Sequence, residues 1–581
     1  MKKLFLNERK DLRLRALLLA GLLLLAVKLL LSGAQQMYLD PEGAALDDMF
    51  MYNAALSIVK GEWLGSYNWL TLSKHSFFAL WLAVLHWLGI PYLLGGQLLW
   101  AGASLAAAWA VLPVLKKRWA GLALFALLLF SPSSTANPAP YGFVLRVYRD
   151  NIFPALCLLC VAGMVGYALR RGERARRSAG WLLLAGLALA ACLLTREDGW
   201  WLLPFVVVAA AVTAVFILRE KQPRRLGRCA MLLLPFLLMA AGNLAWRGMN
   251  YHYYGRFIVS DFSSGEFADA YGAMTRISHE NWNPKVAVPY EVRRQLYDLV
   301  PQFAELEPVL ESEGLKSQFA AGDYSSGSFY WALRQAAAEA GYYATPQTAK
   351  EYFESLAAQI NALCEQGVLP AGPGRSSVSP PIRAEYVGPV VKEGLYSLYF
   401  CATFQQCDAR SIFSPRSNDP GLYQALVAPM EEFLHDKAQT VTKENSSKAY
   451  FSPGQSAAFL VLDVVRYLYA ALLPLGLLAA LAWQVWGGIL WGRRLRAKRV
   501  ESAETLLWLV QLGLLLCILL RAFMVAYVTV SSFTIGTYVM YLASIHPLML
   551  LYAFTGSFCL ARAALRRRGT IKAPRRKVGQ G

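Results

Sequence analysis

Two adjacent carboxylates, Asp47 and Asp48, follow the first long apolar run of this 581-residue chain. A carboxylate can accept the proton of a hydroxyl group that attacks another molecule, which is the work of a general base. The alternative is structural, because an acid near a helix N-terminus stabilises the helix dipole by about 0.3–1 kcal/mol. Adjacent helical residues point about 100° apart, so at most one acid of the pair should face a shared pocket squarely.

Further charged residues stand beside the other apolar runs, and topology alone does not account for them. The cations are Lys74, Arg146, Arg149, Arg196 and Arg521. The acids are Asp150, Glu197 and Asp198. Arg and Lys stabilise the charge on a departing phosphate, and a charge inside an apolar run is costly and usually functional. The structural alternatives are an interfacial ion pair within 146–150 and a solvated hairpin tip at 196–198.

This mixture of signs suits the transfer of a group from a phosphate to a hydroxyl. The carboxylate would take the hydroxyl proton, and the cations would hold the phosphate as it leaves. Nucleotide-activated donors are not expected outside a membrane, so the group would be carried there on a lipid phosphate. A divalent cation such as Mg²⁺ or Mn²⁺ beside Asp47 and Asp48 is an alternative. The six histidines are dispersed and predict no metal cluster.

The composition places these charges in a membrane protein. The chain is 56% hydrophobic and 16% charged, with a mean hydropathy of +0.35, whereas soluble domains are about a quarter charged. A helix needs roughly 20 apolar residues to cross a bilayer. We predict an all-α polytopic fold with about ten transmembrane helices, at 14–32, 93–114, 118–132, 151–169, 179–195, 199–218, 228–247, 456–484, 504–530 and 534–561.

Basic clusters alternate between these spans as the positive-inside tendency requires, which predicts that both termini lie inside. Residues 248–455 carry 16 Lys and Arg against 23 Asp and Glu, a net charge of −7, whereas the rest of the chain carries +26. The basic excess therefore reports topology and anionic headgroups rather than binding to nucleic acid. We predict a multi-pass protein of the cell membrane, with Asp47 and Asp48 on the extracytoplasmic face.

Two juxtamembrane helices are predicted in the first external loop, 33–92. Apolar side chains recur at helical spacing in residues 44–60, and Lys60 and Gly61 form a typical helix end. Residues 77–88 are apolar but too short to span a bilayer. They carry Trp and His side chains that favour the interface, so we expect this helix to lie along the membrane surface.

The chain divides into four predicted segments. They are a transmembrane catalytic module at 1–247, a mainly α-helical external insert at 248–455, closing transmembrane helices at 456–562 and a basic cytoplasmic tail at 563–581. Most of the nine cysteines lie in or beside spans, where they pack as small apolar residues. The insert leaves one disulfide open, most simply Cys401–Cys407.

The order of motifs in the first external loop suggests a family. The acid pair is followed by Gly61-Glu62-Trp63 and then by Lys74, which opens the aromatic helix 77–88. In this order the chain resembles the C-type superfamily of integral-membrane glycosyltransferases, which includes protein O-mannosyltransferases and the lipid A aminoarabinose transferase. The resemblance covers about residues 1–220 and, more loosely, the last two spans. The aminoarabinose branch has Lys-Pro-Pro where this chain has Lys74-His75-Ser76, so the substrate of that branch is not carried over.

The resemblance implies an inverting transferase that uses a polyprenyl-phosphate-linked sugar. Asp48 or Asp47 would be the catalytic base, or would orient the acceptor or a metal ion, with Asp48 slightly preferred. The donor phosphate would be held by Arg146, Arg149, Arg196, Lys74 and Arg521. The candidates for the family's second acidic site are Asp150, Glu197 and Asp198.

The predicted function is the transfer of a sugar from that donor to a glycan, lipid or protein acceptor on the outer face. One alternative is a flippase or transporter for a lipid-linked glycan. Such proteins usually carry internal repeats and charges near the midplane, and neither is visible in the sequence. A second alternative is a non-catalytic cell-envelope assembly protein. A polymerase or ligase of lipid-linked glycans is a variant of the first hypothesis.

Overall fold

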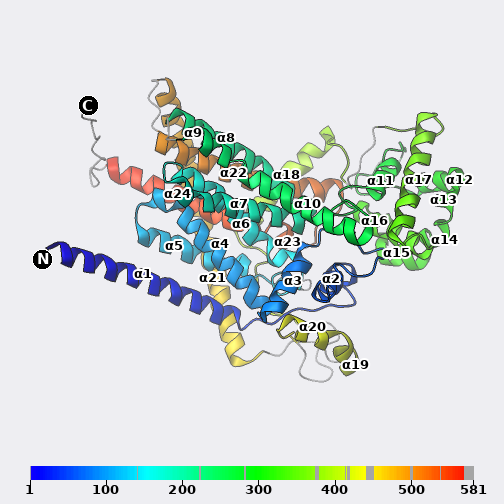
Figure 1. Cartoon of the computed structure of the whole chain (residues 1–581), viewed down its shortest axis with the longest axis horizontal. Coiled ribbons are helices and arrows are strands. Elements are labelled where there is room, and N and C mark those ends of the chain that lie inside the picture. Colours follow the sequence, from blue (N-terminus) through cyan, green and yellow to red (C-terminus); the bar gives the residue numbers. More distant parts are fainter. Residues whose placement is uncertain are drawn as a thin grey trace.

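The structure is a long bundle of helices with a smaller group of helices at one end (Figure 1). This computed structural model describes residues 2–139, 142–220, 224–280, 283–372, 379–412, 414, 419–439, 451–496, 502–536 and 538–567. The bundle helices are α1 (Lys2–Ser32), α4 (Tyr92–Leu115), α5 (Arg118–Leu129), α6 (Phe153–Arg170), α7 (Ala175–Thr195), α8 (Leu203–Arg219), α9 (Arg225–Met231), α10 (Leu234–Tyr254), α21 (Pro453–Arg496), α22 (Ser502–Ser531), α23 (Tyr538–Leu542) and α24 (Ile545–Arg567).

Nine helical stretches in the described ranges are long and apolar enough to cross a membrane, which makes this a multi-pass membrane protein. They are Leu14–Ser32, Tyr92–Leu115, Arg149–Arg170, Ala175–Thr195, Glu197–Arg219, Arg225–Tyr254, Pro453–Arg493, Thr505–Ser531 and Ile545–Leu565. Each corresponds to a predicted span. The all-α polytopic fold that the sequence predicts is therefore confirmed.

The remaining predicted span, 118–132, is the shorter helix α5. Its 12 residues reach about 18 Å, which is less than the roughly 30 Å of a bilayer core. The chain then continues through a buried single turn, η2 (Pro132–Ser134), so α5 and this turn lie together inside the bundle. The orientation with both termini inside depends on this stretch crossing the membrane, and it stays a prediction.

The predicted span 534–561 is broken into α23 and α24. Pro547 lies in the first turn of α24, and a proline cannot donate a hydrogen bond to the carbonyl four residues before it. The break falls at Ala543 and Ser544, the residues four and three positions before this proline. The break leaves the carbonyl oxygen of Tyr541 free to accept hydrogen bonds from Arg521, at 2.8 and 3.1 Å.

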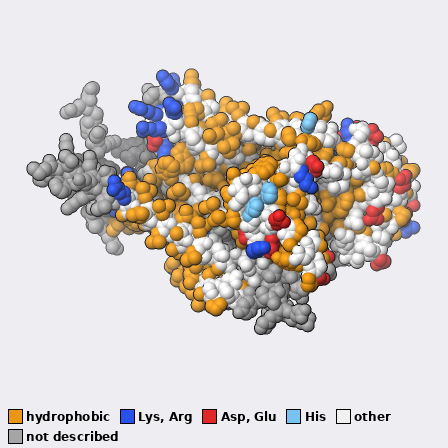
Figure 2. Space-filling view, turned by 60° about the horizontal axis from the view of Figure 1, so that its bottom comes forward, with side chains coloured by type: hydrophobic (Ala, Val, Ile, Leu, Met, Phe, Trp, Pro, Cys, Tyr) orange, Lys and Arg blue, Asp and Glu red, His pale blue; other side chains and the backbone are white. Residues whose placement is uncertain are grey.

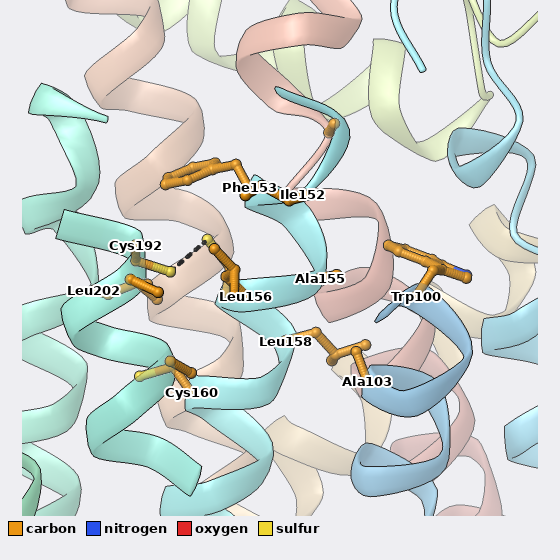
Figure 3. Close-up of a cluster of buried hydrophobic side chains, with 14 of the residues drawn as sticks. Trp100, Ala103, Ile152, Phe153, Ala155, Leu156, Leu158, Cys160, Cys192 and Leu202 are labelled. Carbon is orange, nitrogen blue, oxygen red and sulfur yellow. Dashed lines mark hydrogen bonds between the residues drawn. The ribbon is translucent and has the colours of Figure 1, made fainter. Parts of the chain in front are cut away.

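Helices α4, α6 and α7 form the tightest part of the bundle core, where Trp100, Leu156 and Cys192 lie among buried apolar side chains (Figure 3). The Sγ atoms of Cys157 and Cys192 are 3.9 Å apart across α6 and α7. The two helices approach closely because α6 carries glycine at the contact. A Cβ atom on Gly163 would lie 2.6 Å from the carbonyl oxygen of Trp181.

Replacing Gly163 by Ala is therefore expected to lower the stability of the bundle by about 1–3 kcal/mol, the usual cost of overpacking a core. The matched control is Gly180→Ala on α7, where an added Cβ meets nothing within 4 Å. There the better helix propensity of Ala should leave stability unchanged or raise it. Thermal unfolding of the purified protein in detergent measures both, and equal melting temperatures for the two variants would contradict the packing argument.

Both helices predicted in the first external loop are present. The first is a turn of π-helix, η1 (Ala45–Met49), followed by α2 (Phe50–Val59), and the second is α3 (Phe77–Leu88). Helix α3 ends at Gly89, whose φ of 62° suits a residue without a side chain. Asp47 and Asp48 both lie in the π turn, a rare conformation that occurs frequently at functional sites.

The insert holds a helical group with its own hydrophobic core, which spans buried residues from Phe267 to Leu369. Its helices and short elements are α11 (Glu266–Thr275), α12 (Tyr290–Leu299), α13 (Pro301–Ala304), α14 (Glu307–Leu310), α15 (Glu313–Phe319), β1 (Ala320–Ala321), β2 (Asp323–Tyr324), α16 (Ser326–Glu339) and α17 (Pro346–Glu365). The two strands form one small antiparallel hairpin that pairs Ala320 with Tyr324.

The later part of the insert returns to the bundle. Helix α18 (Ala384–Ala402) packs along α22, and α20 (Ala428–Leu434) packs against α3. Between them lie α19 (Pro420–Leu422) and η5 (Tyr423–Val427). Cys401 and Cys407 are both free and buried in the bundle core, so the disulfide left open by the sequence is not formed.

The surface charges follow the pattern expected from the sequence. Figure 2 shows Lys and Arg side chains gathered at the end of the bundle away from the insert, and Asp and Glu side chains at the insert end. Hydrophobic side chains cover much of the surface between them. Beyond Arg567 the predicted basic tail lies outside the described residues.

Candidate active site

The ten residues singled out in the sequence come together at the insert end of the bundle and form ion pairs with one another. We call them the outer charge cluster, after the side of the membrane on which the sequence predicts them. Its members are Asp47, Asp48, Lys74, Arg146, Arg149, Asp150, Arg196, Glu197, Asp198 and Arg521. They come from five separate segments of the chain, so only the folded bundle assembles them.

The acid pair is held by two cations. The Nε atom of Arg146 donates to both carboxylate oxygens of Asp48, at 2.8 and 2.9 Å. The Nη2 atom of Arg146 donates to Asp47 at 3.2 Å, and the Lys74 ammonium pairs with the other oxygen of Asp47. Arg146 is fixed by the backbone, because Tyr38 pairs with it in a short parallel bridge. One guanidinium therefore bridges the two acids.

The two acids differ sharply in their surroundings. The side chain of Asp48 is 1% exposed, whereas that of Asp47 is 33% exposed. Burial raises the pKa of Asp48 to about 7, although Arg146 opposes this. Burial would also raise the pKa of Asp47, but Lys74 and Arg146 outweigh it and hold that pKa well below its usual value. Asp47 is therefore the more accessible acid of the pair.

Tyr148 joins the acid pair to the next ion pair. Its hydroxyl donates to Asp47 at 3.0 Å. Its ring lies between two guanidinium groups, 5.0 Å from that of Arg146 and 5.2 Å from that of Arg149. Arg149 in turn donates to Glu197 at 2.8 Å, and Glu197 accepts from the backbone N–H of His75 at 2.8 Å. The residue after Lys74 is thus tied to this second pair.

A third group of ion pairs lies at the start of η4 (Glu197–Leu202) and in α22. Arg196 pairs with Asp150 and, at 2.8 Å, with Asp198. Asp198 also accepts from Arg521 at 2.7 Å. Arg521 is fully buried within a candidate span, which explains why it needs a carboxylate and the carbonyl of Tyr541 as partners.

The cluster contains five cations and five carboxylates, so it carries no net charge when all are ionised. It nevertheless retains hydrogen-bonding capacity. Among the described residues, neither Nε of Arg149 nor Oδ2 of Asp150 has a hydrogen-bond partner, although both atoms are buried. Buried polar atoms of this kind are uncommon and are often completed by water or a ligand. The cluster can therefore accept further polar groups.

The insert reaches the cluster through α16, which begins after Ser325 caps its first turn. The Trp331 ring lies 4.8 Å from the Lys74 ammonium. The Tyr330 hydroxyl donates to the carbonyl of Ser73 at 2.8 Å. Arg334 donates to the carbonyl of Trp69 at 2.7 Å. Helix α16 therefore holds the loop that positions Lys74.

Replacing Arg334 by Met should release this loop. Arg334 is fully buried and pairs with buried Asp261 at 2.9 Å. Removing one partner of a buried ion pair costs about 3–5 kcal/mol, and we expect the lower end because Arg256 also pairs with Asp261. Thermal unfolding and limited proteolysis within 66–76 measure the effect. The control is Arg294→Met at an exposed position of α12. Equal changes in melting temperature and cleavage in both variants would contradict the role of Arg334 in holding this loop.

The arrangement does not favour a divalent cation at Asp47 and Asp48. Three of the four carboxylate oxygens accept from Arg146, and the fourth accepts from Lys74 and Tyr148. In the described part of the chain, no group of three or more His, Cys, Asp and Glu side chains is placed to hold a metal ion. A metal ion would have to displace these cations first.

Comparisons with known proteins were made for the sequence and for the fold. No protein-family profile matches the chain, and no curated protein is similar to it in sequence. Two solved structures of ArnT from Cupriavidus metallidurans are similar to it over 96% of this chain and 79% of theirs. The apo structure has 13% identity and a TM-score of 0.28. The structure bound to undecaprenyl phosphate has 12% identity and a TM-score of 0.30.

A structural similarity to ArnT is thus present over most of the chain. At these TM-scores it establishes neither activity nor substrate. The case for a function therefore rests on the geometry of the outer charge cluster.

Sequence reasoning missed two contributors to the cluster. Tyr148 lies within the motif that supplied Arg146 and Arg149, but nothing in its spacing marks it as the bridge between them. Trp331 is distant from the first loop in the sequence, and only the packing of the insert brings it to Lys74. An aromatic residue inside a charged motif is the one signal that could have identified Tyr148.

Proposed function

We propose that this protein is a membrane glycosyltransferase. It transfers a sugar from a polyprenyl-phosphate-linked donor to a hydroxyl group of a glycan, lipid or protein acceptor on the extracytoplasmic face. The observation that carries the proposal is Asp47, a partly exposed carboxylate held between Lys74 and Arg146. A base for the acceptor and two cations for a phosphate stand in contact there.

The charge balance suggests how donor binding activates the base. A donor phosphate diester brings one negative charge to a cluster that is neutral without it. Lys74 is the cation best able to neutralise this charge, because its ammonium is a point charge on a flexible stem. When Lys74 turns to the phosphate, Asp47 loses the partner that lowers its pKa. Its pKa then rises, and Asp47 becomes a better base only when the donor is bound.

The proposed transfer step conserves both atoms and charge. The acceptor oxygen forms a bond to the anomeric carbon of the sugar, and its proton goes to Asp47. The bond between that carbon and the phosphate oxygen breaks, and its electron pair stays on the polyprenyl phosphate. Asp47 loses one negative charge as the phosphate gains one, so the cluster keeps its charge through the step. Inversion, as the resemblance implies, places acceptor and phosphate on opposite faces of the sugar. Asp47 contacts the acceptor and Lys74 contacts the phosphate, so the two side chains must separate before the transfer step.

The other members have supporting roles in this proposal. Asp48 is a positioning residue that fixes the guanidinium of Arg146. The Nε–H group of Arg149 has no hydrogen-bond partner among the described residues, so Arg149 is the second candidate to bind a phosphate oxygen. Asp198 is part of the second acidic site, held by Arg196 and Arg521.

The pH dependence of sugar transfer distinguishes the role of Asp48 from that of Asp47. Because the pKa of Asp48 is about 7, lowering the pH through 7 should protonate Asp48 and weaken its hold on Arg146. Transfer activity should therefore fall as the pH falls through about 7. Asp48→Asn should remove this limb of the profile and leave reduced but measurable activity. A pH profile of kcat in nanodiscs tests this, and an unchanged acid limb in Asp48→Asn would exclude Asp48 as its source.

A direct test of the function uses purified protein in nanodiscs with a panel of undecaprenyl-phosphate-linked sugars carrying a radiolabel. The proposal predicts release of free undecaprenyl phosphate and transfer of label to an acceptor. The competing function, a flippase, predicts movement of the labelled lipid across a liposome membrane with no covalent change. Movement without chemistry for every donor would overturn the proposal.

A further inference from the structure

Helix α18 exposes a stripe of large apolar side chains and turns one carboxylate toward the bundle. Its exposed face carries Val391, Leu395, Tyr396 and Tyr399, whose exposed fractions lie between 42% and 59%. Its inward face instead carries the carboxylate of Glu393, which accepts from the hydroxyl of Tyr538 at 2.7 Å. A helix that packs in water usually turns its large apolar side chains inward and its charges outward.

The position of α18 explains this exposed apolar stripe. The helix packs along α22, which contains the candidate span Thr505–Ser531. The two backbones approach closely at Gly394, where a Cβ atom would lie 2.6 Å from the ring of Phe523. Phe523 is two residues from Arg521, so the middle of α18 lies at the level of the outer charge cluster. The helix therefore runs beside a membrane-spanning segment rather than out in the insert.

The start of α18 marks the end of the span. The hydroxyl of Ser532, just past α22, donates to that of Ser379 at 3.0 Å, and Tyr527 donates to the carbonyl of Pro380. From this point α18 crosses the end of α22 toward α23, where Phe400 packs against Tyr538 with ring centroids 5.4 Å apart. Phe523 is eight residues before the end of α22, or about 12 Å along a helix. That depth lies within one leaflet of a bilayer.

We infer that α18 is embedded in the lipid leaflet on the side of the outer charge cluster, with its exposed face against lipid acyl chains. The inference goes beyond the proposed function and does not depend on it. A transmembrane helix needs apolar residues where it meets lipid, and it keeps charged residues toward protein. Helix α18 follows this rule through its exposed stripe and its inward Glu393.

Two charged side chains of α18 are exposed. Glu385 lies in the first turn, next to the end of the span, and pairs there with Arg383 at 3.8 Å. Lys392 is compatible with lipid. Its long stem allows the ammonium to reach the headgroup region while the methylene groups stay among the acyl chains. Tyr396 and Tyr399 belong to the residue type that concentrates at membrane interfaces. The stripe therefore fits the headgroup boundary of one leaflet better than the centre of the bilayer.

Lipid is favoured over a protein partner because the apolar surface continues onto a span. Leu516 and Leu520 on α22 are also exposed, and they lie in the segment that must itself face lipid. The same acyl chains can cover both helices. The insert is then not wholly soluble, because α18 anchors its later part in the membrane. The helical group with its own core, from Phe267 to Leu369, stays outside this contact.

Photo-crosslinking to lipid tests the inference. The amino acid p-benzoylphenylalanine, which resembles tyrosine in shape, is placed at position 399 and, in a second variant, at position 395. A control carries it at Glu354, an exposed position of α17. The full-length variants are reconstituted in vesicles of phosphatidylethanolamine and phosphatidylglycerol and irradiated, and intact masses are measured. Variants enter the comparison when they elute and melt as the wild type does.

The inference predicts phospholipid adducts at 399 and 395, at least tenfold more abundant than at 354. Two results would overturn it. One is a folded variant at 399 with no more lipid adduct than the control. The other is a crosslink to a second copy of the chain in place of lipid, which would make this face a protein interface. Failure of the transfer assay would leave the inference untouched, because no substrate takes part in this measurement.

Discussion

Replacing Asp47 by Asn is expected to lower the rate of sugar transfer by about 10²–10⁴-fold, the usual contribution of a general base. The amide keeps the size of the side chain and its hydrogen bond from Tyr148, but it cannot take the acceptor proton. Donor binding should persist or improve, because Lys74 no longer has a carboxylate to leave. The measurement is kcat with labelled donor in nanodiscs, together with the Kd for undecaprenyl phosphate.

The matched control for this variant is Glu42→Gln, five residues earlier on the same loop and exposed. It should retain the activity of the wild type. Insertion in the membrane and melting temperature should be unchanged in both variants. An Asp47→Asn protein that turns over at the normal rate would eliminate Asp47 as the base. Loss of donor binding together with activity would instead give Asp47 a role in holding the site together.

Replacing Arg146 by Gln is expected to have the second large effect, this time on stability as well as activity. Arg146 is the guanidinium that bridges both acids. Without it, buried Asp48 loses its charged partner, and removing one partner of a buried ion pair costs about 3–5 kcal/mol. The unfolding free energy in detergent should fall by about this amount, and transfer should fall below detection.

A double variant separates the two effects. Arg146→Gln with Asp48→Asn removes the buried carboxyl group that has lost its partner and leaves two amides that can hydrogen-bond. We expect it to be more stable than Arg146→Gln alone by about 1–3 kcal/mol, because contacting charges are strongly coupled. Activity should stay low, since the phosphate still lacks Arg146, one of its two cations. Additive stability losses in the double variant would show that Arg146 and Asp48 do not act as a pair.

Much of this architecture follows from hydrophobic runs and basic clusters. The nine spans, the helix Phe77–Leu88 and the π turn with α2 lie where the sequence predicts helices. Run length and charge are local properties, so they can be read without knowing the packing. The span predicted at 118–132 differs because α5 ends at Leu129 and the chain enters a buried turn. Hydropathy cannot distinguish a buried turn from the end of a span.

The candidate site was predictable as a set of residue types but not as a geometry. Each of the ten charged residues lies beside an apolar run or, for Arg521, within one. Their pairing depends on which ends of which helices meet, and that is a property of the whole bundle. The family resemblance slightly favours Asp48 over Asp47 as the catalytic base. The fold buries Asp48 against Arg146 and leaves Asp47 partly exposed. The proposed function therefore gives the substrate contact to Asp47 and a positioning role to Asp48.

The role of the insert was the least predictable part of the site from the sequence. Nothing in 248–455 predicts that Arg334 binds the backbone of the first loop or that Trp331 covers Lys74. These contacts join residues more than 250 positions apart, which no periodicity records. Helix α18 was likewise hidden, because its three charged residues resemble those of a soluble helix until its inward and outward faces are known.

The central claim is that the outer charge cluster recognises a lipid phosphate through Lys74. The most direct measurement is the affinity of the purified protein for undecaprenyl phosphate and for undecaprenol, which lacks the phosphate, in wild type and in Lys74→Met. The matched control is Lys60→Met, an exposed lysine of the same loop. We predict binding of the phosphate in preference to the alcohol, and at least tenfold weaker binding of the phosphate in Lys74→Met only. Equal affinity for phosphate and alcohol, or an unchanged Kd in Lys74→Met, would contradict the account.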